Sequence, residues 1–153
     1  MLAPYPGWDH FQPRIEQALE QYRSVAGPDG IVRAGIRYVN HIHLPAGTVR
    51  LHDYFATPPA IPDRINLVMR QVFERLVVEL TDKGNAASIT FASLPHIGDQ
   101  QSFVLDLDVF HEGRDAALPL TRAIELVNNL HQDEGELFEA LITDKAREPF
   151  NGT

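Results

Sequence analysis

One stretch of the sequence does most to decide the fold: Arg37-Tyr38-Val39-Asn40-His41-Ile42-His43-Leu44-Pro45. From residue 32 to residue 44 the chain alternates at the period of a β-strand, in which successive side chains point to opposite faces. The even positions form the mostly apolar face, namely Val32, Ala34, Ile36, Tyr38, Asn40, Ile42 and Leu44. The odd positions include the polar groups Arg33, Arg37, His41 and His43. The pattern predicts a strand with one face in the core and a cationic, imidazole-bearing face opposite.

Three more strands are expected further along the chain. Residues 73–80 are rich in β-branched side chains and end at the turn Asp82-Lys83-Gly84-Asn85, and residues 87–94 form the next short strand. This arrangement is typical of a hairpin. The fourth strand, residues 103–110, directs alternate apolar side chains toward one face, namely Phe103, Leu105, Leu107 and Val109. The whole segment from Ile65 to Leu80 also fits a helical stripe and is ambiguous, and the strand is predicted for its second half.

Helices are predicted at both ends of the chain. Residues 9–26 carry apolar side chains at helical spacing, with Asp9 as the expected N-cap and the turn residues 27–30 as the stop. A long helix is expected from about Pro119 to Arg147, and a short helical turn from Leu51 to Tyr54. Short links between consecutive strands favour antiparallel pairing. The prediction is one α+β domain over residues 1–153, a curved antiparallel sheet of about four strands flanked by the N-terminal and the long C-terminal helix.

Three successive landmarks carry a resemblance to a known family. They are Gly35-Ile36-Arg37-Tyr38-Val39-Asn40, residues 103–110 (Phe-Val-Leu-Asp-Leu-Asp-Val-Phe), and Leu130-His131 followed by Glu136-Leu137-Phe138-Glu139 and residues 142–148. From about Trp8 to Phe150 the chain resembles the C-terminal part of the TIGR04255 family, sporadically distributed bacterial proteins that are usually longer. The resemblance implies architecture more than activity. It also implies a chain without the N-terminal portion of the longer members. If that portion adds strands to the sheet, the edge or face exposed here is expected to be covered by another chain.

Composition narrows the functional classes. The 153 residues include no cysteine, which excludes disulfides and thiolate chemistry and fits a cytoplasmic location. The formal net charge of -8 argues against direct binding of nucleic acid over the whole surface, so nucleic acid is expected only through a larger complex. Residues 1–7 lack the features of a signal peptide, and no apolar run is long enough to span a membrane. No cofactor motif is present.

Two pairs of residues are candidates for metal chemistry. His41 and His43 share a strand face, as do Asp106 and Asp108, and imidazole and carboxylate are ligands for divalent ions. The competing interpretation is a surface histidine pair and a cross-strand charge ladder, in which Arg33, Arg37 or Arg75 pairs with the two aspartates. The ladder is favoured because the opposite charges fall on strands expected to be neighbours. His96 and His111 are further candidate ligands.

These observations favour a non-catalytic protein-interaction subunit of a larger bacterial assembly. The contact surface is expected on the sheet face or edge, organised by Arg33, Arg37, Tyr38 and Asn40, with a protein partner or a second copy of the chain bound there. The family resemblance adds a phage-defence or CRISPR-type complex as a candidate context. The alternative is a small metal-dependent hydrolase or nuclease that uses the four candidate ligands His41, His43, Asp106 and Asp108.

Overall fold

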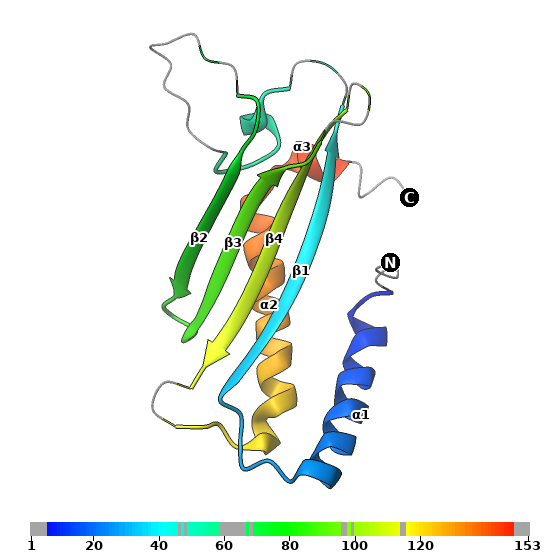
Figure 1. Ribbon diagram of the computed structural model, residues 1–153, viewed down its shortest axis with the longest axis vertical. Helices are drawn as coiled ribbons and strands as arrows, with labels where there is room; N and C mark the ends of the chain where they lie inside the picture. Colours follow the sequence, from blue (N-terminus) through cyan, green and yellow to red (C-terminus); the bar gives the residue numbers. More distant parts are fainter. Residues whose placement is uncertain are drawn as a thin grey trace.

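In the part of the chain that the structure describes, four antiparallel strands form one open, twisted sheet in the order β1-β4-β3-β2. They are β1 (Arg33–Leu44), β2 (Phe73–Leu80), β3 (Asn85–Ser93) and β4 (Gln101–Glu112). β2, β3 and β4 follow one another as a meander, and β1 adds to the far side of β4 (Figure 1). The predicted α+β class, the antiparallel sheet and the β2–β3 hairpin are therefore confirmed. The computed structural model describes residues 6–45, 47, 49–58, 67, 69–95, 98, 100–113 and 116–148.

Two helices accompany the sheet, α1 (Trp8–Ala26) and α2 (Ala123–Leu141). α2 lies behind the sheet in Figure 1 and packs against β1 and β4. Its apolar stripe is largely buried there, with Leu130 fully covered and Leu126 8% exposed. α1 lies on the β1 side of the sheet (Figure 1) and contains no buried residue. In the described part of the chain no helix is both long enough and apolar enough to span a membrane.

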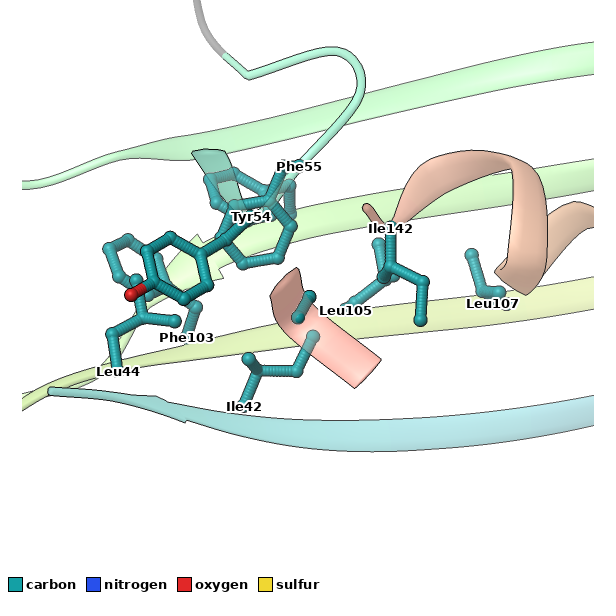
Figure 2. Packing of buried hydrophobic residues seen from close by; sticks show 10 residues of the cluster. Ile42, Leu44, Tyr54, Phe55, Phe103, Leu105, Leu107 and Ile142 are labelled. Carbon is teal, nitrogen blue, oxygen red and sulfur yellow. The ribbon is translucent and has the colours of Figure 1, made fainter. Parts of the chain in front are cut away.

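The core lies between the sheet and α2 and continues under the loop that contains Tyr54 and Phe55. Figure 2 shows side chains of β1 and β4 meeting this loop and Ile142. Phe91 stacks on Phe103 at a centroid distance of 5.2 Å, and Phe55 meets both rings edge-on at 4.7 and 5.7 Å. Aromatic side chains bury large areas and prefer these offset and edge-on geometries. Residues after β1 therefore close one end of the sheet. The helical turn predicted from Leu51 to Tyr54 is a 3₁₀ turn over Leu51–Asp53.

The predicted C-terminal helix is wrong in its extent. α2 ends at Leu141, where Ile142 turns to an extended conformation and forms a β-bridge with Phe55. A separate short helix, α3 (Asp144–Arg147), begins after Thr143, whose side chain accepts a hydrogen bond from the Ala146 N–H. A threonine N-cap starts a new helix because it satisfies a backbone donor that has no partner in the first turn. The tertiary bridge and this cap together break the helix that the apolar spacing suggested.

The start of the first helix also differs from the prediction. α1 begins at Trp8, after Gly7, so Asp9 lies within the first turn and not at the N-cap. Gly7 has φ of 97°, a conformation that glycine adopts at little cost, and no side chain caps this helix. Pro13 lies inside the helix, beyond its first turn. Gly27 ends α1 in the left-handed region, as the predicted turn requires.

Candidate functional site

A charge ladder crosses β1 and β4 on the face of the sheet opposite α2. The register places Arg37 opposite Asp108 and diagonal to Asp106. Arg37 donates from Nε and Nη2 to the two carboxylate oxygens of Asp106, at 2.8 and 2.6 Å. Arg33 lies 3.5 Å from Asp108 and 3.4 Å from Glu112. The hydrogen bonds to Asp106 and the charge of that carboxylate raise the pKa of Arg37. The predicted cross-strand ladder is therefore confirmed.

The arginines of this ladder form ion pairs with Asp106 and Asp108, the two carboxylates proposed as metal ligands. Asp106 and Asp108 each face a guanidinium, while His43 Nδ1 lies 2.8 Å from Ser102 Oγ. His111 faces the α2 side, where its Nδ1 lies 3.2 Å from Asn85 Oδ1, and His96 falls outside the described residues. Among the residues described, no group of three His, Asp or Glu side chains is arranged to hold a metal ion. A neighbouring arginine also opposes a cation electrostatically.

The predicted interaction residues divide between the two faces of β1. Arg33 and Arg37 lie on the open face, whereas Tyr38 and Asn40 point toward α2. Tyr38 Oη lies 3.4 Å from His131 Nδ1 on α2. Asn40 Nδ2 donates to the Leu105 carbonyl at 3.2 Å. Tyr38 and Asn40 thus join β1 to its neighbours, and only the two arginines are presented on the open face.

α1 is joined to the rest of the molecule mainly at its first turn. The Trp8 ring stacks on His131 at a centroid distance of 4.0 Å, and burial lowers the pKa of that histidine. Further along the helix, Tyr22 is 59% exposed and Val25 is 88% exposed. The predicted helix is confirmed, but none of its residues is buried, and Tyr22 of its apolar stripe is exposed.

A buried polar group at the hairpin end was not predicted. Asp133 is 5% exposed and accepts hydrogen bonds from Lys83 Nζ and Asn85 Nδ2, each at 2.7 Å. Lys83 also reaches Glu136 at 2.6 Å, and these hydrogen bonds raise the pKa of Lys83. The next residue, Glu134, is 6% exposed, and burial raises its pKa to about 7. The signal in the sequence was two adjacent acids in the apolar stripe of a helix, which is unusual in a buried position.

The open face of the sheet is shallowly hollowed. The depression has a volume of about 320 Å³ and is lined by Arg37, Phe73, Arg75, Ser88, Thr90, Asp106 and Asp108. Arg75 donates from Nε to Ser88 Oγ at 2.9 Å, so two arginines and two aspartates hold fixed positions around it. Ligand sites are usually concave and mostly apolar. This charged, open hollow resembles a contact surface more than a small-molecule pocket.

The edge strand β2 carries the densest exposed apolar surface of the sheet. Phe73 is 73% exposed, Val77 66% and Leu76 48%. Phe73 and Val77 lie on the open face. Leu76 lies on the opposite face, where α2 packs against β1 and β4. Large apolar side chains are therefore exposed on both faces of β2 in the described structure. Edge strands of this kind are usually shielded or paired, since their free backbone groups bind other strands.

The fold and the site define an α+β protein with a half-covered sheet and an apolar edge. Scans against models of known protein families, against curated proteins and against solved structures find no match for this chain. The resemblance to the TIGR04255 family stays a prediction.

Proposed function

We propose that this chain is a non-catalytic protein-interaction subunit of a larger bacterial assembly. One observation carries the proposal: Phe73, Leu76 and Val77 are large apolar side chains left exposed on one edge strand. Large apolar side chains that are exposed close together mark sites of protein association. The open backbone edge of β2 adds hydrogen-bonding groups that a partner strand satisfies.

The neighbouring open face supports the same function. Arg75, next to Phe73 and Val77 on that face, borders the hollow that Arg37, Asp106 and Asp108 also line. Fixed charges around an apolar patch select the partner and set its orientation more than they add affinity. The alternative of a metal-dependent hydrolase is not favoured, since its two carboxylates lie in ion pairs with arginines.

Native mass spectrometry of the protein isolated gently from its own host tests the proposal. We expect an assembly heavier than one chain, and we expect Val77→Lys to release the chain from it. Val32→Lys is the matched control, because Val32 is 68% exposed and lies outside the strands. A lone wild-type chain with a stoichiometric divalent ion contradicts the proposal. So does an assembly that Val77→Lys leaves intact. A partner from a defence system would support the context that the family resemblance implies.

A further inference from the structure

We propose that the partner of the β2 edge is a second copy of this chain, joined as an antiparallel β2–β2 pair about a two-fold axis at Val77. This inference rests on the proposed function and names the occupant of that surface. In the described part of the chain, β2 has a strand on one side only, with β3 as its neighbour (Figure 1). The pairing would join two sheets into one continuous sheet.

The backbone fixes which residues of β2 face the free edge. Ser93 N–H donates to the Val72 carbonyl at 3.0 Å, and Val72 N–H donates to Ser93 Oγ at 3.0 Å, so the polar groups of Val72 point toward β3. Residues of an antiparallel pair alternate between those that bond the neighbour and those that do not. The odd residues of β2 therefore direct their N–H and C=O groups outward: Phe73, Arg75, Val77 and Glu79.

Outward residues must then pair with outward residues of the second copy, which leaves few registers. The register centred on Val77 places Arg75 opposite Glu79 of the second copy, and Glu79 opposite its Arg75. Registers centred on Arg75 or Glu79 place like charges opposite each other, which is unfavourable. In no other register does Arg75 lie opposite Glu79 of the second copy. The strand is thus self-complementary in charge at the one register that also brings the two exposed Val77 side chains together.

The same register also covers the other face of β2. On this face Leu76 lies opposite Val78 of the second copy. The two-fold axis repeats this contact, with Val78 opposite Leu76 of the second copy. Leu76 is 48% exposed in the single chain because α2 packs on β1 and β4 instead. Apolar cross-strand pairs stabilise antiparallel sheets. One pairing therefore brings exposed side chains from both faces of β2 into cross-strand contact.

The opposite edge of the sheet does not offer this symmetry. β1 carries Arg33, Arg37, His41 and His43 and has no Asp or Glu, so no register of β1 with itself pairs opposite charges. α1 also lies on that side of the sheet (Figure 1). The charge pattern therefore assigns self-association to β2.

Sedimentation velocity of the purified protein tests the charge pairing. We expect a concentration-dependent dimer, which Arg75→Glu and Glu79→Arg each weaken roughly tenfold, because each change turns two attractive cross-strand pairs into repulsive ones. The double variant Arg75→Glu/Glu79→Arg restores the pairs and the wild-type affinity. Arg14→Glu, an equal charge change at an exposed position of α1, leaves the dimer unchanged. A protein that is monomeric at every concentration overturns the inference, and so does a double variant no better than the single ones.

A disulfide test remains informative even where a charge variant folds poorly. The chain has no cysteine, so Val77→Cys introduces a single thiol. Directly opposed hydrogen-bonded residues lie about 5.5 Å apart at Cα, within the range that a disulfide spans. We expect Val77→Cys to oxidise rapidly to a covalent dimer and the equally exposed Val32→Cys to do so slowly. Equal rates overturn the inference. A monomer in isolation that is bound to another protein in its host contradicts only this inference and leaves the proposed function standing.

Discussion

Glu134 offers the sharpest test of the packing between α2 and the sheet. It is 6% exposed, and burial raises its pKa from the ordinary 4.5 to about 7. The folded chain therefore binds more protons than the unfolded chain between these values, so stability is highest at acidic pH and falls as pH rises through about 7. A shift of one pKa unit corresponds to about 1.4 kcal/mol, so the raised pKa of Glu134 lowers the free energy of unfolding at alkaline pH by about 3 kcal/mol. Glu134→Gln removes the ionisation, and we expect it to remove this loss.

Urea unfolding of both proteins from about pH 5 to about pH 8 measures the difference. We expect the variant to gain about 2–3 kcal/mol in free energy of unfolding relative to the wild type over this interval, most of it below about pH 7. Burial lowers the pKa of His131, so the stability that depends on its neutral form is lost as pH falls. Both proteins share this loss, so the difference between their free energies of unfolding isolates Glu134. Glu20→Gln, at an exposed position on α1, is the control. A difference between wild type and Glu134→Gln that stays constant with pH would refute the burial argument.

Two other substitutions probe the core and the buried polar group. Leu130→Ala removes a fully buried side chain and should lower the free energy of unfolding by about 2–5 kcal/mol, whereas Val25→Ala, at an 88% exposed position, should change it by less than about 0.5 kcal/mol in chemical denaturation. Asn85→Ala removes the amide that donates to Asp133 and should cost about 1–3 kcal/mol. A change for Asn85→Ala no larger than that of Val25→Ala would show that the buried hydrogen bond is not needed for stability.

The strands were predictable because alternation is a local property. Ile36, Ile42 and Leu44 of β1 are buried, as are the four predicted core residues of β4, and each follows directly from a period of two. The charge ladder followed too, since the arginines of β1 and the aspartates of β4 occupy the non-core faces of strands that pair. The register between β1 and β4 then determines which arginine pairs with which aspartate.

Features that depend on contacts distant in sequence were not predictable. The break after Leu141 requires the bridge between Ile142 and Phe55, which lie far apart in the chain. The burial of Asp133 requires the hairpin to bring Lys83 and Asn85 beside α2. The division of the predicted interaction residues followed from strand geometry, because Arg37 and Tyr38 are adjacent and must point to opposite faces. Residues that are close in sequence on a strand lie on the same face only when their positions are both odd or both even.

An apolar pattern identifies a face that prefers burial without identifying what covers it. The stripe of α1 and the alternation of β2 resemble those of core elements, yet α1 contains no buried residue and β2 exposes Val77 and Leu76 on its two faces. At about 25 cal/mol for each Å² of apolar surface, leaving such side chains in water forfeits stabilisation that α2 and β4 obtain within the chain. The charge pattern of β2 adds information that hydrophobicity lacks, because Arg75 and Glu79 lie symmetrically about Val77. Covering this edge with its own copy would bring the exposed side chains of β2 into contact and place opposite charges across from each other.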